Sequence, residues 1–332
     1  MSNFPEVRIL SAEECERAVD ASALIDEIAR GFVEYSAGRV AVPPVGHLGF
    51  DDPPGDLHVK YGHVRGDDVF VIKAATGFPR NVERGLPTGD GAMLVLDART
   101  GLLRAILLDH ARLTDLRTAA AGAVAARALA RRDVRCVGVL GAGVQARSHV
   151  EAMSHVRRIR RCRVVSRNTE HARKLADELS ESYAFAVEAV ETIEDALRGA
   201  DLIVTATNAK DAVVRRALSA DGAHINAVGS CTPHTRELDA ETVAASSMFV
   251  DSVESTVNEA GDYIRALKEG AVGPEHIRAE LGEVLNGAKP GRTSSEEITL
   301  FKSLGLAVED LAAAEYLYRK SKETGAGTWV KF

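Results

Sequence analysis

The spacing of hydrophobic and polar positions changes several times along the chain, and each change marks a different kind of element. Residues 11–19 and 22–36 have apolar positions at amphipathic-helix spacing. Ser11 stands three residues before Glu14, which is a capping-box pattern typical of a helix start. The first forty residues are therefore predicted to be helical.

From residue 56 to 109 short apolar runs alternate with turn-forming residues. The runs are "DLHVKYGHV", "VFVIKAATGF", "AMLVLD" and "LLRAILLD", and glycine, proline and aspartate separate them. Consecutive short strands joined by such turns predict an antiparallel meander.

After Thr114 the pattern changes to small residues, "TAAAGAVAARALA", which predicts a helix packed closely on its neighbour and a domain boundary nearby. From 134 to about 250, strands such as "VRCVGVL", "RCRVV", "DLIVTAT" and "GAHINAV" alternate with helices. This order predicts an α/β fold with a Rossmann-type doubly wound parallel sheet. Ser294, three residues before Glu297, predicts the start of a long helix over "ITLFKSLGLAVEDLAAAEYLY".

Composition and charge narrow the class of protein. The 332 residues are 45% hydrophobic and 27% charged, as in ordinary globular chains, and the net charge of −7 argues against a nucleic-acid or anionic-membrane partner. There is no apolar run of the roughly 20 residues that cross a bilayer and no signal-peptide core, so a cytoplasmic protein is expected. The four cysteines lack metal-binding spacing, and neither they nor His58 and His63 indicate a metal site.

Residues 138–146, "GVLGAGVQA", stand between a predicted strand and a predicted helix. Gly141 permits a tight turn, Gly143 lets the backbone approach a pyrophosphate at the helix N-terminus, and Ala146 replaces the usual third glycine. The context predicts dinucleotide binding, and the alternative is a glycine turn in an α/β core.

The end of the next strand bears on the choice between NAD and NADP. It carries Ser166, Arg167 and Asn168, with no carboxylate before Glu170. An acidic residue there would bind the ribose 2′-hydroxyl, whereas arginine accommodates a 2′-phosphate. NADP(H) is therefore predicted to be preferred, with NAD(H) as the second cofactor; the alternative is that Arg167 only begins the next helix.

Two basic residues stand where an exposed cation is not expected. Lys73 has the strand parity of Val69 and Val71, so it is predicted to face an apolar or ligand-binding space, where burial lowers a lysine pKa and permits proton transfer. The alternative is a lysine whose ammonium reaches solvent, which is also the interpretation of Lys60. Arg117 is predicted in the first turn of a helix capped by Thr114 or Asp115, where a cation indicates a nearby anion or a pair with Asp115.

Five ordered motifs, "VIKAATGFPRN", "TDLRTAAAGAVAA", "GAGVQA", "INAVGS" and "EEITLFKSLGLAVEDLAAA", together resemble the ornithine cyclodeaminase and mu-crystallin family. The resemblance covers residues from about 40 to 320. It implies a homodimer in which residues 1–118 with 305–332 form a discontinuous α+β dimerisation and substrate-binding domain. Residues 119–304 would then form the Rossmann dinucleotide-binding domain.

The resemblance also implies roles for individual residues. Lys73 matches a lysine that contacts substrate and handles a proton, and Arg117 matches an arginine that binds the substrate carboxylate next to the dinucleotide. The positions that match dinucleotide contacts, beyond the glycine loop and strand end named above, are Thr88, Arg117, Val144, Gln145, Thr207, Ile225, Asn226, Ala227, Val228 and Ser303.

The chain departs from the family pattern at two positions. Cyclodeaminases carry an aspartate base in the turn after "INAVGS", but this chain has Cys231, and a thiol is a poor substitute for that carboxylate. Relatives also place an arginine shortly after the proline of "VAVPPVGHLGF", and His47 is the candidate replacement for substrate binding. The first departure favours the dehydrogenase and reductase branch, and the second leaves the substrate's second anchor open.

The sequence thus predicts an NAD(P)-dependent imine reductase or amino acid dehydrogenase, such as alanine dehydrogenase. Its substrate would be a 2-imino acid, a cyclic ketimine or an amino acid, and no metal would be needed. One alternative is an ornithine or lysine cyclodeaminase that releases ammonia. The other, from a different class, is a non-catalytic mu-crystallin-like protein that binds NADPH and a small ligand.

Overall fold

The structure is a computed structural model that describes residues 6–331. Its contacts divide the chain into two compact units: unit 1 extends to Arg117 and includes the segment from Leu306 onward, and unit 2 is Thr118–Gly305. Within the described residues no helix is long and apolar enough to cross a membrane.

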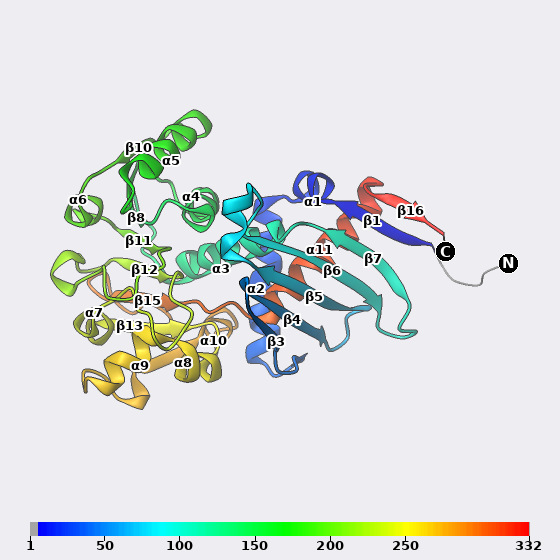
Figure 1. Ribbon diagram of the computed structural model, residues 1–332. Coiled ribbons are helices and arrows are strands. Elements are labelled where there is room, and N and C mark those ends of the chain that lie inside the picture. The colour runs from blue at the N-terminus through cyan, green and yellow to red at the C-terminus, as the bar shows by residue number, and fades with distance from the viewer. Residues whose placement is uncertain (1–5, 332) are drawn as a thin grey trace. The chain divides into compact units, whose positions relative to one another are not determined.

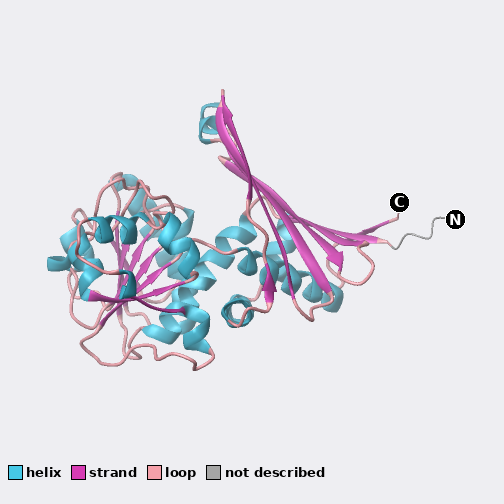
Figure 2. Cartoon of the chain, turned by 90° about the horizontal axis from the view of Figure 1, so that it is seen from below, coloured by secondary structure: helices cyan, strands magenta, loops and turns pink. Residues whose placement is uncertain are grey.

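Unit 1 is a twisted, mostly antiparallel sheet with helices on one face (Figures 1 and 2). In spatial order its strands are β16 (Thr328–Val330), β1 (Val7–Ser11), β7 (Leu103–Leu108), β6 (Gly89–Asp97), β5 (Val69–Gly77), β4 (Pro54–Val64) and β2 (Val40–Ala41), with β3 (Gly46–Asp51) also paired to β4. Its helices are α1 (Ala12–Ala18), α2 (Ala21–Ser36) and α11 (Ala307–Thr324), with a short 3-10 helix at Pro79–Arg84. The predicted meander is strands β4 to β7, each antiparallel to the next.

The start of the chain differs from the helical prediction, because residues 7–11 form strand β1. This strand lies parallel to β7 and antiparallel to β16. The predicted capping box exists at its end, where Ser11 Oγ accepts the Glu14 N–H and the Glu14 carboxylate accepts the Ser11 N–H. A five-residue strand directly before a strong helix signal leaves too short a pattern to detect.

Unit 2 contains the predicted doubly wound sheet, and Figure 2 shows its strands with helices on both sides. The parallel strands follow the order β10 (Ala186–Ala189), β9 (Arg161–Val165), β8 (Cys136–Leu140), β11 (Leu202–Thr205), β12 (His224–Ala227), β15 (Ile298–Lys302), β13 (Ser246–Val250) and β14 (Ile277–Glu280). The helices are α4 (Val144–Val156), α5 (Thr169–Ser182), α6 (Ile193–Leu197), α7 (Ala240–Ala245), α8 (Val253–Glu259), α9 (Gly261–Lys268) and α10 (Leu281–Leu285), while α3 (Arg112–Leu129) crosses the boundary between the units.

The long C-terminal helix predicted from residue 298 is wrong in its first part. Residues 298–302 are the fully buried strand β15, between β12 and β13, and helix α11 begins only at Ala307. Ser294 Oγ does accept the Glu297 N–H, but this contact closes a turn that leads into a strand. A continuous apolar run such as "ITLF" fits a strand covered on both faces as well as it fits a helix.

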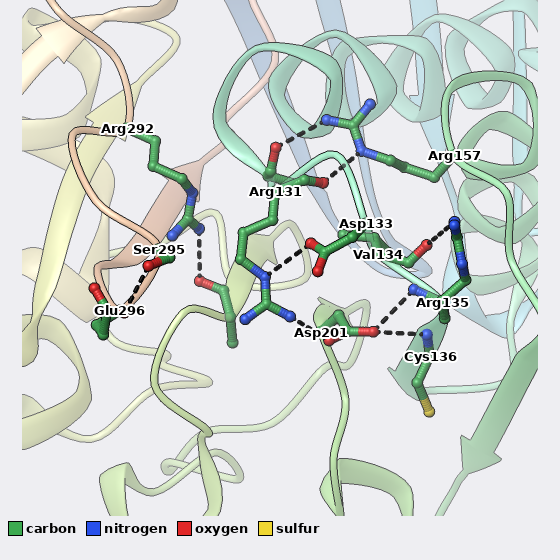
Figure 3. Close-up of polar contacts among 12 residues, drawn as sticks. Arg131, Asp133, Val134, Arg135, Cys136, Arg157, Asp201, Arg292, Ser295 and Glu296 are labelled. Atoms are coloured by element: carbon green, nitrogen blue, oxygen red, sulfur yellow. Dashed lines mark hydrogen bonds and ion pairs between the residues drawn. The ribbon is translucent and has the colours of Figure 1, made fainter.

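The amino edge of the parallel sheet is held by an arginine-rich network (Figure 3). Asp201 accepts hydrogen bonds from the Arg131 side chain and from the backbone N–H groups of Arg135 and Cys136, which fixes the starts of β8 and β11 together. Arg157 donates to the carbonyl oxygens of Ala126, Ala130 and Arg131 at the C-terminus of α3. Such contacts satisfy the last carbonyls of a helix and leave the opposite, carboxyl edge of the sheet for a ligand.

Candidate functional site

The carboxyl edge of the unit 2 sheet contains a cavity of about 770 Å³ where the chain order reverses between β8 and β11. Such switch points are where doubly wound sheets bind ligands. The cavity is lined by the glycine loop, by the ends of β9 and β11 and by the segment after β12, including Gly141, Gly143, Val144, Gln145, Ser166, Arg167, Thr207, Val228 and Gly229. The sequence-predicted residues that the structure brings together therefore form one continuous wall.

The glycine loop has the geometry that a pyrophosphate needs. Gly141 has φ +114°, and a Cβ there would clash with the Ala206 carbonyl oxygen. A Cβ at Gly143 would meet only open space, directly before the N-terminus of α4. Ala146 is fully buried, so the third position of the motif is filled by a residue small enough to pack there. These residues fit a dinucleotide, whose phosphates would bind the helix N-terminus.

The end of β9 combines one structural residue with two that border the cavity. Asn168 caps α5, because its Oδ1 accepts the N–H groups of Glu170 and His171. Ser166 and Arg167 line the cavity, and the exposed Arg167 guanidinium donates to Asn208 Oδ1 at 2.7 Å. Arg167 thus has a solvent-facing cation beside the cavity, whereas Asn168 has a capping function.

A buried carboxylate that sequence analysis missed holds the cavity rim. Glu237 Oε1 accepts the Thr207 N–H and hydroxyl, both at 2.7 Å, while Oε2 accepts the Thr205 hydroxyl at 2.7 Å and the Gly229 N–H at 2.8 Å. Burial raises the pKa of Glu237, although Lys302 and the threonine hydroxyls act in the opposite direction. Glu237 therefore fixes the strand ends at Thr207 and Gly229 with respect to one another.

Lys302, at the end of β15, lies beneath the turn that carries Cys231. Its Nζ is fully buried, forms an ion pair with Asp262 Oδ2 at 3.1 Å and donates to the carbonyl oxygens of Ala227 and Ser230. Burial opposes the charged form, but Asp262, Cys231 and Glu237 outweigh it and raise the pKa of Lys302. A lysine inside an apolar strand is the sequence signal that could have indicated this network.

The remaining predicted dinucleotide positions lie elsewhere. Ile225, Asn226 and Ala227 are fully buried within β12, where Asn226 donates to the Gly122 carbonyl oxygen. Ser303 is buried after β15, its N–H bonded to the Ala227 carbonyl oxygen. Thr88 is exposed in unit 1, where its carbonyl oxygen accepts the Phe78 N–H. Within the described chain these five residues do not border the cavity.

The turn after β12 exposes Cys231, whose Sγ donates to the Val228 carbonyl oxygen at 3.4 Å. Val228 and Gly229 line the cavity, whereas Cys231 lies just beyond it. The backbone of this turn therefore shapes the cavity wall.

In unit 1 the two predicted substrate residues converge on one carboxylate. Lys73 Nζ donates to Asp310 Oδ1 at 2.9 Å, and Arg117 Nε donates to the same oxygen at 2.8 Å. Arg117 Nη1 also bonds Glu309 Oε2 at 2.9 Å. All four side chains are buried, and both acids lie in the first turn of α11, where the helix dipole favours negative charge.

Two sequence expectations for Arg117 need correction. Helix α3 begins at Arg112, so Arg117 lies in its second turn and neither Thr114 nor Asp115 caps the helix. Its acidic partners come from α11 instead of from Asp115. Sequence analysis could not detect this pairing, because 192 residues separate Arg117 from Glu309.

The pKa values of Lys73 and Asp310 are both lowered, but for different physical reasons. Burial lowers the pKa of Lys73, and the nearby Arg117 adds to this effect, while Asp310 opposes it. Burial favours the neutral form of Asp310, but Arg117 and Lys73 outweigh it and lower its pKa. Asp310 Oδ2 is buried without a hydrogen-bond partner among the described residues, so this carboxylate retains an open acceptor.

Lys60 and His47 share the sheet face of Lys73. Lys60 lies directly opposite Lys73 in the β4–β5 register, and cross-strand neighbours project to the same face. Lys60 is half-buried beside Lys73, so its side chain is partly accessible to solvent. His47 lies opposite His58 in the β3–β4 register and is exposed.

Comparison with known proteins gives consistent matches over nearly the whole chain. A sequence model of the ornithine cyclodeaminase/mu-crystallin family matches residues 6–325. A Delta(1)-pyrroline-2-carboxylate reductase of Bacillus cereus is 35% identical over 325 residues, which cover 98% of this chain and 99% of the relative.

Solved structures agree with these sequence matches. The Thermococcus litoralis Delta(1)-pyrroline-2-carboxylate reductase in complex with NADH and L-proline is 36% identical, with a TM-score of 0.92 over 98% of this chain and 100% of that chain. An archaeal alanine dehydrogenase dimer with bound NAD is 31% identical, with a TM-score of 0.91 over 99% of this chain and 100% of that chain. A lysine cyclodeaminase is 27% identical, with a TM-score of 0.84 over 99% of this chain and 96% of that chain.

Proposed function

The chain belongs to the ornithine cyclodeaminase/mu-crystallin family, and we propose that it is an NAD(P)-dependent oxidoreductase acting on a C=N bond beside a carboxylate. The substrate class is a 2-imino acid or cyclic ketimine in the reductive direction, or the corresponding amino acid in the oxidative one. The observation that carries the proposal is the convergence of Lys73 and Arg117 on the buried Asp310.

Each basic residue has a role that follows from its chemistry. Arg117 presents a planar guanidinium that binds carboxylates in a fixed geometry, and its pairing with Glu309 and Asp310 holds that guanidinium in place. Lys73, whose pKa is lowered by burial, can donate a proton to the substrate nitrogen or bind its carboxylate. Asp310 keeps both cations oriented before substrate binds.

Unit 2 supplies the redox partner. A bound NAD(P)H would supply the hydride for the substrate α-carbon. The glycine loop would hold the pyrophosphate, and Glu237 keeps the cavity rim at Thr207 and Gly229 in shape. In the reductive direction the C=N π bond breaks, the α-carbon gains the hydride, and the nitrogen gains the proton, so that an amine and oxidised cofactor result.

We further propose that NADP(H) is preferred over NAD(H), because the cation beside the cavity at the end of β9 is Arg167 and no carboxylate lines that strand end. Replacing Arg167→Asp is expected to shift the ratio of kcat/KM for NADPH over NADH towards NADH by about tenfold or more. Asn168→Ser, which retains a capping side chain, is the matched control. An unchanged ratio in Arg167→Asp would contradict the assigned 2′-phosphate contact.

A homodimer is proposed from the exposed apolar side chains of the unit 1 sheet. Leu48, Phe50, Tyr61 and Leu108 are all at least 40% exposed, and burial of such side chains between two copies is favourable. Light scattering after size-exclusion chromatography should give twice the chain mass of 35.4 kDa. A particle of the single-chain mass at micromolar concentration would refute the dimer.

The decisive test of the activity is cofactor oxidation by the purified protein. Δ1-pyrroline-2-carboxylate, its six-membered ring homologue, and 2-oxo acids with ammonia or methylamine should be assayed with NADPH and with NADH. Consumption that disappears in Lys73→Ala supports the proposed reductase. Ammonia release from L-ornithine or L-lysine with catalytic NAD⁺ would instead identify a cyclodeaminase, and NADPH binding without turnover in either assay would favour the non-catalytic role.

A further inference from the structure

A group of three ligand-forming side chains lies on the β3–β4 hairpin of unit 1. His47, Asp56 and His58 place one ligand atom each so that all three atoms lie within 4.8 Å of one another. His58 Nε2 is 3.8 Å from Asp56 Oδ2, and the two imidazole rings meet edge to face with centroids 4.8 Å apart. Neither Asp56 nor His58 has a role in the proposed reductase.

The sheet geometry explains why these side chains meet. Asp56 and His58 are two residues apart on β4, so they project to the same face of the strand. His47 lies directly opposite His58 in the antiparallel register, which brings a third ligand to that face from β3. The arrangement depends only on one hairpin and its register.

We propose that His47, Asp56 and His58 form a binding site for a divalent transition metal ion of the zinc class. Two imidazole nitrogens and one carboxylate oxygen suit Zn²⁺, Co²⁺ or Ni²⁺, and three protein ligands leave a coordination position open to solvent or to another ligand. Ligand atoms around a tetrahedral Zn²⁺ are separated by about 3.4 Å, as bond lengths of about 2.1 Å require. His47 is exposed and Asp56 and His58 are partly buried, and small rotamer changes would bring their ligand atoms from within 4.8 Å to that spacing.

The local electrostatics bear on the strength of binding. Burial lowers the pKa of His58, as do His47, Lys60 and Lys73, whereas Asp56 raises it; the net shift is downward. Metal coordination uses the neutral imidazole, so binding should weaken as the pH falls. Lys60, on the same face, repels a dication and should weaken its binding.

The proposed metal site lies close to Lys73, which is proposed to contact the substrate. His58 and Lys73 lie on adjacent strands of one sheet face, two positions apart in register, so their Cα atoms are about 8 Å apart. A bound dication would add positive charge to the face that also carries Lys73. The metal site itself stands on the hairpin geometry and is independent of the proposed reductase activity.

Metal binding is tested by titrating EDTA-treated, dialysed protein with Co²⁺, followed by visible absorption, and with Zn²⁺, followed by calorimetry. One equivalent per chain is expected. His47→Gln, Asp56→Asn and His58→Gln should each weaken binding at least tenfold, and the Co²⁺ spectrum should change in each variant. Thermal melts and NADH binding check that these variants remain folded.

Two control variants separate this site from others. His63→Gln alters a histidine of the same strand that projects to the opposite face and has Nδ1 3.0 Å from the Val69 carbonyl oxygen. Cys231→Ser removes the exposed thiol of unit 2. Both should bind Zn²⁺ like the unchanged protein. Binding lost in either control but retained in His58→Gln, or no saturable binding up to millimolar Zn²⁺, would overturn the proposal.

Discussion

Lys73 in unit 1 and Lys302 in unit 2 are both buried and each faces an aspartate, at 2.9 Å and 3.1 Å, yet their pKa values shift in opposite directions. The pKa of Lys73 is lowered, because burial disfavours its charged form and Arg117, which shares the same Asp310 oxygen, adds a like charge. Burial also disfavours the charged form of Lys302, but Asp262, Cys231 and Glu237 outweigh it and raise the pKa. A buried lysine–aspartate pair therefore does not define a role; its neighbours do.

The comparison separates a structural cation from a reactive one. Lys302 also donates to two backbone carbonyl groups, and the adjacent Glu237 carboxylate accepts four hydrogen bonds. Asp262 Oδ2 and Asp310 Oδ2 are both buried without a hydrogen bond among the described residues, but Asp262 Oδ2 lies 3.1 Å from Lys302 Nζ, whereas Lys73 and Arg117 both contact the other oxygen of Asp310. Saturated networks rigidify a protein, whereas an open acceptor and a depressed lysine pKa are typical of a site that exchanges protons.

The largest expected effect is on stability, in Lys302→Met. The change leaves Asp262 and Glu237 buried without their cation, which should cost about 3–5 kcal/mol of unfolding free energy. Urea denaturation measures the loss. The double variant Lys302→Met/Asp262→Asn should recover part of it, and a loss below about 1 kcal/mol in the single variant would remove the distinction between the two lysines.

Lys73→Met should instead act on catalysis. We expect kcat/KM for imine reduction to fall about a thousandfold or more, because the proton donor is removed while Asp310 keeps its pairing with Arg117. NADH affinity, measured by fluorescence titration, should stay within about twofold of the unchanged protein. Activity within tenfold of that protein would assign Lys73 the same structural role as Lys302.

Glu237→Gln tests the clamp at the cavity rim with an isosteric change. A glutamine amide replaces one acceptor oxygen with an NH₂ donor. In one orientation that NH₂ group faces the Thr207 donors, and in the other it faces the donors of Thr205 and Gly229. We therefore expect the free energy of unfolding to fall by about 1–3 kcal/mol. Weaker NADPH binding should accompany it. Glu297→Gln is the control and should leave cofactor affinity unchanged. Glu297 lies in the turn directly before β15.

The smallest effect is a shift in the pH profile. Since the folded-state pKa of Lys73 is lowered from 10.5, the protonated lysine is lost at a lower pH than for a free side chain. The kcat/KM for imine reduction should therefore fall on the alkaline side at a pH below 10.5. Lys60→Gln removes one like charge from the face, so this limb should move to higher pH; a movement to lower pH would contradict the electrostatic assignment.

Sequence analysis predicted the features that depend on local pattern. The parallel sheet, the meander, the glycine loop and the burial of Lys73 all follow from short-range periodicity. It missed features created by contacts distant in sequence: β1, the acidic partners of Arg117, and Glu237 as a clamp. The error at residues 298–302 has a different cause, because a buried central strand and a buried helix share the same apolar composition.

Unit 1 is assembled from both ends of the chain, whereas unit 2 is one continuous segment. During synthesis the whole of unit 2 leaves the ribosome before α11 does, and domains generally fold as units in the order in which they emerge. Lys73 and Arg117 thus lack their buried carboxylate partner until Asp310 is made, nearly 200 residues after Arg117. The dinucleotide-binding segment can therefore mature first, and the cluster proposed to bind substrate is completed last.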